Sequence, residues 1–294
     1  MPPTIEFVAA SNSLGTKEGW NDIQGAFWRS GAVAGDFVHE EVTPRFEAKA
    51  CDVIRRHAAS GTDRPRFLYV ALPSPHTPWL PLEEFRGQSG AGMYGDFVMQ
   101  VDAVVGSIMT ALEESGMANE TLLLFSSDNG PVWYEKDVER FGHRSTGPFR
   151  GMKFSSWEGG HRMPFIARWP ARIPAGTTCE RTIVFSDVFA TFAELNGVAT
   201  WEDEQAEDSV SFLPWLLKPD LTQETRPPII HDRKTIRDGD WKRILPGNRR
   251  RAEIQSDVPE LYHLRDDPGE QRNRFHEARE QAEQLKSQLL KTLE

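Results

Sequence analysis

A carboxylate and an amide stand next to each other at Asp128 and Asn129, directly after the apolar run Leu122–Phe125. A run this short and this apolar predicts a strand that is buried on both faces of a sheet. Gly130 and Pro131 follow and turn the chain. In open α/β sheets ligands gather at the carboxyl ends of strands, and carboxylate and amide oxygens are ligands suited to Ca²⁺ or Mg²⁺. The segment therefore indicates either a divalent-cation site or an Asx-type turn that caps local backbone, and on its own it favours neither.

A histidine, His76, stands in a second polar loop that also follows an apolar run. That run, Phe67–Leu72, predicts another buried strand, and the proline-rich sequence PSPHTPWLP comes directly after it. A helix is predicted over Tyr94–Glu114, because apolar side chains recur there at helical spacing. A strand, a helix and a strand in this order predict a right-handed βαβ crossover and a parallel sheet. We therefore expect His76 and Asp128 to lie near each other at one sheet edge.

The α/β pattern continues on both sides of this unit. The spacing of apolar residues and the capping residues predict a helix over residues 43–60, a third buried strand over residues 165–167 and a helix over residues 185–195. Residues 1–42 show no sustained period, so we expect an irregular excursion there. The acidic run Glu202–Asp208 predicts a solvated loop.

The composition shifts near Pro219, where short strand-like segments separated by turn signals begin. These segments are Pro228–His231, Thr235–Arg237, Trp241–Leu245 and Glu260–Leu264. They predict an antiparallel meander with turns at residues 237–240 and 246–248. A final helix is predicted over Phe275–Leu293 with one apolar face. We therefore expect two domains, residues 1–218 and residues 219–294.

Length and charge exclude several classes of protein. The 294 residues suffice for one large domain, or for one domain with a small appendage. With 44 acidic against 34 basic residues, the formal charge of −10 argues against a nucleic-acid binder, which needs a basic face. We expect no membrane span, because no run of about 18 apolar residues occurs, and the first residues lack the features of a signal peptide. Cys51 and Cys179 have no zinc-binding spacing and are expected to be ordinary buried thiols.

Several long motifs occur in a fixed order along the chain, among them FLYVALPSPHTP, TLLLFSSDNGP, GPFRGMKFSSWEGGHRMP and ELYHLRDDPGEQRN. Together they resemble the second half of a type I sulfatase, an arylsulfatase-like enzyme of the alkaline phosphatase-like superfamily. The resemblance implies an α/β fold in which helices sandwich a mostly parallel sheet, with a small C-terminal antiparallel sheet and a helix.

The resemblance also implies roles for individual residues. Asp128 and Asn129 would bind the divalent cation, usually Ca²⁺ but also Mg²⁺, and Asp128 would lie beside the nucleophile. His76 would bind the sulfate and protonate the leaving group, and Lys153 would hold the sulfate by its positive charge. Sulfate-ester cleavage needs such a Lewis acid and proton donor. Without the resemblance, His76 would be interpreted as a loop residue and Lys153 as a surface lysine. Residues 157–160, Glu158 among them, would shape the turn into the next strand rather than perform chemistry.

One part of the family pattern is missing. Sulfatases of this type carry an aspartate pair and then a motif of Cys or Ser, any residue, Pro or Ala, any residue and Arg, whose first residue becomes formylglycine. We expect this chain to start after that motif. The stretch from Cys51 to Arg55 has similar spacing, but Val53 replaces Pro or Ala and the stretch is inside a predicted helix. The stretch from Thr146 to Arg150 leads into the Lys153 loop, so neither stretch is expected to supply the nucleophile.

The sequence therefore predicts the C-terminal portion of a metal-dependent sulfuric ester hydrolase that is inactive alone. Its substrate would be a sulfate-ester small molecule or a sulfated glycan. The enzyme would release sulfate from a sulfated sugar or from an aryl substrate. One alternative is a phosphate or phosphonate ester hydrolase of the same superfamily. The other is a non-catalytic fragment that only binds sulfate or a partner. Family members are often exported or lysosomal, but the sequence names neither the compartment nor the oligomeric state.

Overall fold

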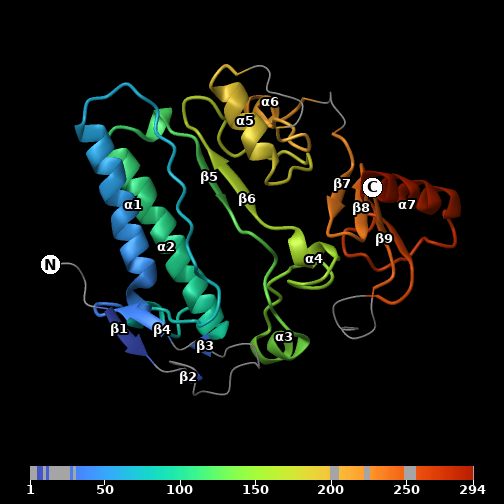
Figure 1. The fold of residues 1–294 in the computed structure, drawn as a ribbon, viewed down its shortest axis with the longest axis horizontal. Helices are drawn as coiled ribbons and strands as arrows, with labels where there is room; N and C mark the ends of the chain where they lie inside the picture. Colours follow the sequence, from blue (N-terminus) through green and yellow to red (C-terminus); the bar gives the residue numbers. More distant parts are fainter. Residues whose placement is uncertain are drawn as a thin grey trace. The chain divides into compact units, whose positions relative to one another are not determined.

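The computed structural model describes residues 5–8, 11–12, 27–28, 31–198, 205–221, 226–247 and 256–293. The chain divides into two compact units. Figure 1 shows the ribbon coloured by residue number from the N-terminus to the C-terminus. The first unit comprises Met1–Thr121 with Glu135–His143, and the second comprises Leu122–Tyr134 with Arg144–Glu294. The domains predicted from composition, residues 1–218 and 219–294, stay a prediction.

Two long helices form the centre of the first unit. The helices α1 (Val42–Ala59) and α2 (Gly92–Glu114) lie side by side (Figure 1) and confirm the two predicted helices within two residues at each end. Their buried apolar residues are Ala50, Cys51, Ile54, Phe97, Val101, Val104, Ile108, Ala111 and Leu112. By length and composition α2 is long and apolar enough to cross a membrane, and half of its apolar window is buried inside the protein.

The chain before α1 contains more regular structure than predicted. The strands β1 (Ile5–Val8) and β4 (Gly31–Ala34) pair antiparallel, and so do the short strands β2 (Ser11–Asn12) and β3 (Phe27–Trp28). The expectation of an irregular excursion over residues 1–42 is therefore wrong at these segments. The remainder of this first unit adds the short 3₁₀ helices η1 (His39–Glu41), η2 (Glu83–Phe85) and η3 (Ala118–Glu120) and the helix α3 (Glu135–Phe141).

The predicted parallel βαβ unit is wrong for the described strands. The run Phe67–Leu72 forms no strand, and Phe67 and Tyr69 are 72% and 79% exposed. The strand β5 (Leu123–Ser126) exists, but it pairs antiparallel with β6 (Phe165–Arg168) and is half-buried rather than buried on both faces. All strand pairs among the described residues are antiparallel. An apolar run indicates that a segment is suited to burial in a sheet. It does not indicate which strand it pairs with or whether the pairing is parallel or antiparallel.

The C-terminal part of the second unit agrees with its prediction, except that the helix begins at Arg279 rather than at Phe275. The strands β7 (Ile229–His231), β8 (Thr235–Asp238), β9 (Trp241–Ile244) and β10 (Glu260–His263) form one antiparallel sheet in the order β10-β9-β8-β7. The helix α7 (Arg279–Leu293) covers this sheet (Figure 1). Their common core contains Ile236, Leu261, Phe275, Ala282, Leu285 and Leu289. Gly239 adopts a left-handed φ of +55° in the predicted turn between β8 and β9, which glycine allows without strain.

Three shorter helices complete the second unit: α4 (Glu158–His161), α5 (Asp187–Leu195) and α6 (Leu213–Leu217). The carboxylate of Asp187, fully buried, pairs with Arg226 and accepts backbone hydrogen bonds from Val184 and Val210. The predicted acidic loop is described only from residue 205 onward, and the turn predicted at residues 246–248 only through Gly247. Cys179 is exposed, so the expectation that both thiols are buried holds for Cys51 alone.

Candidate functional site

The loop after β5 carries the predicted cation ligands at the carboxyl end of that strand. Asp128 is exposed and Asn129 is half-buried. The side-chain nitrogen of Asn129 donates to Asp128 Oδ1, and Ser127 Oγ donates to the carbonyl oxygen of Asn129 at 3.1 Å. Both contacts are local, but neither is the bond from a backbone N–H to an Asp or Asn side-chain oxygen that defines an Asx-type turn. Because Asn129 donates through its nitrogen, its amide oxygen stays available as a ligand.

Backbone hydrogen bonds connect this loop to the segment that contains Lys153. The N–H of Lys153 donates to the carbonyl oxygen of Pro131 at 2.8 Å, and the N–H of Gly130 donates to that of Gly160 at 2.9 Å. A side chain at Gly130 would collide with the carbonyl oxygen of Gly159, so only glycine fits this contact. The structure therefore joins the segments of Asp128, Asn129 and Lys153 within one unit.

An exposed aromatic ring stands next to the lysine. The side chain of Phe154 is 58% exposed, and Lys153 Nζ lies 5.5 Å from the centroid of its ring. The backbone of Phe154 is left-handed, with φ +79°, a conformation that is costly for a bulky residue. The hydrogen bonds on either side, from Lys153 N–H to the carbonyl oxygen of Pro131 and from Ser155 N–H to that of Met152, hold this strained turn, which the sequence did not signal.

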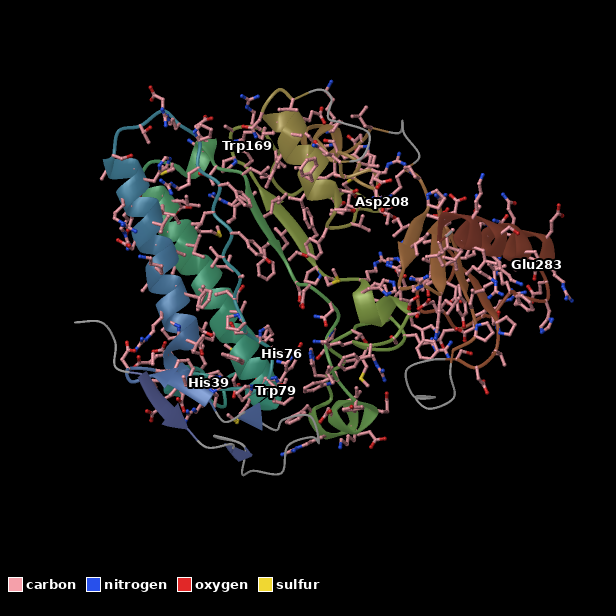
Figure 2. The ribbon with its side chains drawn as sticks, in the orientation of Figure 1. His39, His76, Trp79, Trp169, Asp208 and Glu283 are labelled. Atoms are coloured by element: carbon pink, nitrogen blue, oxygen red, sulfur yellow. The ribbon has the colours of Figure 1, made fainter. Side chains whose placement is uncertain are left out.

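His76 lies in the first unit, on the exposed loop that follows Phe67–Leu72. Figure 2 labels it together with Trp79 near one end of α2, where Trp79 packs on Tyr94 at 5.4 Å between ring centroids. Its Nδ1 lies 2.8 Å from the carbonyl oxygen of Thr77, which can only accept, so this contact requires a proton on Nδ1. Since Asp128, Asn129 and Lys153 belong to the second unit, their convergence with His76 stays a prediction.

The donor set for a cation is a partial one. Asp128 and Asn129 provide hard oxygen atoms, which fit Ca²⁺ or Mg²⁺, whereas Ca²⁺ takes roughly six to eight such ligands. Across the described part of the chain, no group of three or more His, Cys, Asp and Glu residues could hold a metal ion. These two residues therefore fit as part of a ligand shell whose other ligands come from elsewhere.

The two stretches with nucleophile-like spacing have structural roles. Cys51 is buried in α1, its thiol faces the carbonyl oxygen of Ser107 at 3.7 Å, and burial raises the pKa of this thiol. Thr146 Oγ1 donates to the carbonyl oxygen of Phe149 at 3.1 Å. Arg150 donates to the hydroxyl of Tyr262 at 2.9 Å and stacks on the ring of Trp157. These contacts agree with the expectation that neither stretch supplies the nucleophile.

A buried charged cluster behind the site was not predicted. Lys242 Nζ lies 2.9 Å from both Glu158 Oε1 and Glu270 Oε1, and the three residues are 0%, 1% and 0% exposed. The sequence of β9 gave no signal, because a lysine in a strand, here between Trp241 and Arg243, is normally expected to face solvent. Glu158 was expected only to shape a turn.

The cluster and its neighbours have shifted pKa values. Burial would raise the pKa of Glu158, but its contacts with His161 and Lys242 outweigh burial and hold this pKa well below its ordinary value. Burial raises the pKa of Glu270 to about 7 against the opposing charge of Lys242. His231 stacks on His161 with ring centroids 4.1 Å apart, and burial together with the charges of His161 and Lys242 lowers its pKa to about 3.

Known proteins resemble the chain in sequence. The Sulfatase family model matches residues 16–198. An N-acetylgalactosamine-6-O-sulfatase of Bacteroides thetaiotaomicron is 34% identical over 271 residues, which cover 86% of the chain and 51% of that protein. A steryl-sulfatase of Rattus norvegicus is 36% identical over 181 residues, covering 61% of the chain and 30% of that protein.

A solved structure resembles the chain as well. It comes from work on the metabolism of multiple glycosaminoglycans by Bacteroides thetaiotaomicron. The match has a TM-score of 0.76 and a sequence identity of 30%, and it covers 90% of this chain and 57% of that structure's chain. The alkaline phosphatase-like fold class expected from the motifs is thereby confirmed. The chain spans about half the length of the N-acetylgalactosamine-6-O-sulfatase and of this solved structure, since the matches cover 51% and 57% of their lengths.

Proposed function

Since the chain belongs to the sulfatase family, we propose that its Asp128, Asn129 and Lys153 form the sulfate-binding part of a sulfuric ester hydrolase. The observation that carries this proposal is the pair of backbone hydrogen bonds that joins the Lys153 segment to the loop after β5. A lysine and two hard oxygen ligands held on one loop system are the groups that a sulfate ester needs. His76 is the fourth proposed member.

Each residue has a proposed chemical role. Lys153 binds a sulfate oxygen through its ammonium group. Asp128 and Asn129 hold a divalent cation, Ca²⁺ or Mg²⁺, which acts as a Lewis acid on the sulfate when bound. His76, whose Nδ1 is held by the carbonyl oxygen of Thr77, donates a proton from Nε2 of its imidazolium form to the leaving alkoxide oxygen.

The nucleophile is not among these residues. The family typically uses a formylglycine, and hydrolysis through a covalent intermediate requires an activated group near the bound ester. Cys51 is buried with a raised pKa, and the hydroxyl of Thr146 is bonded to local backbone. We therefore propose that the chain alone binds sulfate esters but does not turn them over.

A sulfated sugar is the proposed substrate class. A relative that matches 86% of the chain is an N-acetylgalactosamine-6-O-sulfatase, whose name gives a sulfated sugar, whereas the similarly related steryl-sulfatase is named for a sterol. The exposed ring of Phe154 next to Lys153 would suit the face of a sugar or of an aryl group.

Calorimetric titration of the full chain with para-nitrophenyl sulfate in the presence of Ca²⁺ tests the proposal. Lys153→Met should weaken binding by about tenfold or more, because it removes a charge-assisted contact. Lys286→Met, which changes an exposed lysine of α7, is the matched control and should leave the affinity unchanged. Equal affinities of all three proteins would contradict the proposal, and selective binding of the phosphate ester would favour a phosphate or phosphonate hydrolase instead.

Turnover of the same aryl ester is a separate measurement. The chain should release no nitrophenol above background even with added Ca²⁺, and Cys51→Ala should change nothing. Turnover that disappears in Cys51→Ala or Thr146→Ala would show that the chain carries its own nucleophile.

A further inference from the structure

Three charged residues far apart in the sequence meet at the start of α4. The N–H of Glu158, the first residue of this helix, donates to Glu270 Oε2 at 2.6 Å. The carboxylate of Glu158 accepts a hydrogen bond from Lys242 Nζ at 2.9 Å, and the same ammonium lies 2.9 Å from Glu270 Oε1. One ammonium from β9 and one carboxylate after β10 thus hold both the backbone and the side chain of Glu158.

The helix that they hold is in direct backbone contact with the proposed binding loops. Gly159 donates to the carbonyl oxygen of Arg150 at 2.8 Å, and Gly160 accepts from Gly130 at 2.9 Å. A side chain at Gly159 would meet the carbonyl oxygens of Arg150 and Gly151 at 2.6 and 2.5 Å. Because no side chain separates these backbones, a shift of α4 must move the Gly130 turn and the segment that leads to Lys153.

Further basic side chains lie against Glu158 at the rim of the cluster. Arg162 and Arg237 lie 3.6 and 3.8 Å from Glu158 Oε2, and His161 lies 3.3 Å from Oε1. A buried ion pair is weak evidence for stability, since apolar residues of similar volume often serve as well. Fixing one defined geometry is the better attested use of such buried charges.

We propose that Lys242, Glu158 and Glu270 are positioning residues, which fix α4 and through it hold the Asp128–Pro131 loop and Lys153 in their binding geometry. This inference deepens the proposed function and rests on it for the role of the loop. It assigns the C-terminal sheet, through Lys242 and Glu270, a direct part in shaping the site.

Hydrogen exchange of backbone amides in the full chain tests the inference without any ligand. In Lys242→Met, the amides of Gly130, Lys153 and Gly159 should exchange about tenfold faster relative to those of Asn196 and Gly197 at the end of α5. Lys242→Arg keeps the positive charge and should restore most of the protection. Glu270→Gln, which keeps an acceptor for the Glu158 amide, provides a milder variant if Lys242→Met does not fold.

A neighbouring residue gives the matched control. Trp241 precedes Lys242 on β9 and packs against the core between the sheet and α7. Trp241→Ala should lower the unfolding midpoint but should speed exchange at Gly130 and Lys153 no more than in α5. Uniform acceleration in Lys242→Met, or an equally selective effect of Trp241→Ala, would overturn the inference. If Lys242→Met loosens the loop selectively while Lys153→Met leaves ester binding unchanged, the positioning stands and the proposed function fails.

Discussion

Two regions of the second unit hold carboxylates that differ in solvent exposure. Asp128 is exposed, and its polar contacts are the amide of Asn129 and the hydroxyl of Ser127. Glu158 and Glu270 are buried and share the ammonium of Lys242. The charge of Asp128 is open to a ligand, whereas the charges of the buried pair are compensated inside the protein. This difference separates the residues proposed to bind from those proposed to position.

Removing the shared ammonium should have the largest effect. Lys242→Met removes the ammonium that pairs with Glu270 and the closest cation to Glu158, and we expect it to lower the free energy of unfolding by about 3 to 5 kcal/mol. Denaturant unfolding measures this loss. Lys286→Met removes only an exposed pair with Glu283 and should change stability by less than about 0.5 kcal/mol. Similar values for both variants would remove the contrast between buried and exposed charges.

A core substitution tests whether the sheet that presents Lys242 is held by α7. Leu285 is fully buried in the core between this helix and the sheet. Leu285→Ala should cost about 2 to 5 kcal/mol, because it removes apolar contacts and leaves a cavity. The neighbouring exposed residue gives the control: Lys286→Ala should stay within about 0.5 kcal/mol of the unchanged protein. An unchanged unfolding midpoint in Leu285→Ala would mean that α7 is not docked.

The buried surroundings of the cluster also predict a pH dependence. His231 is neutral in the folded protein because its pKa is lowered to about 3 from the ordinary 6.5. Between these values the unfolded chain binds the additional proton, so this residue's contribution to stability is present above pH 6.5 and is lost as pH falls. The slope is at most roughly 1.4 kcal/mol per pH unit.

Replacing the histidine should remove that slope. His231→Gln should flatten the loss of stability between pH 6.5 and pH 5, measured as unfolding midpoints across this range. His276→Gln, at an exposed position, serves as the control and should leave the pH profile unchanged. A profile of His231→Gln that matches the unchanged protein would contradict the assigned environment of His231.

The smallest expected effect concerns the strained residue beside Lys153. Phe154→Gly relieves a left-handed backbone and should raise the free energy of unfolding by up to about 1 kcal/mol. Phe189→Gly replaces a half-exposed helical phenylalanine in α5 and should instead lower it by about 1 kcal/mol. A loss of stability in Phe154→Gly as large as that in Phe189→Gly would mean that the ring of Phe154 contributes packing that outweighs the strain.

Local signals predicted the meander and the position of the loop with Asp128. The turn at Gly239 and the other turn signals that separate the short strands are properties of neighbouring residues, and the loop with Asp128 directly follows the apolar run that forms β5. Pairing depends instead on distant segments: nothing in Phe67–Leu72 indicates its partner or direction. Lys242 was missed for the same reason, because its two carboxylates are distant in the chain and become neighbours only after folding.

The most direct test of the contrast compares Asp128→Asn with Glu158→Gln by two measurements on each protein. Calcium-dependent binding of para-nitrophenyl sulfate is measured by calorimetry, and the unfolding midpoint is measured in denaturant. We expect Asp128→Asn to lose the calcium-dependent part of the affinity while its unfolding midpoint stays unchanged. Glu158→Gln should lower the midpoint, because it disrupts the pair with Lys242. Calcium-dependent ester binding by Asp128→Asn equal to that of the unchanged chain would contradict the assignment of Asp128 to ligand binding.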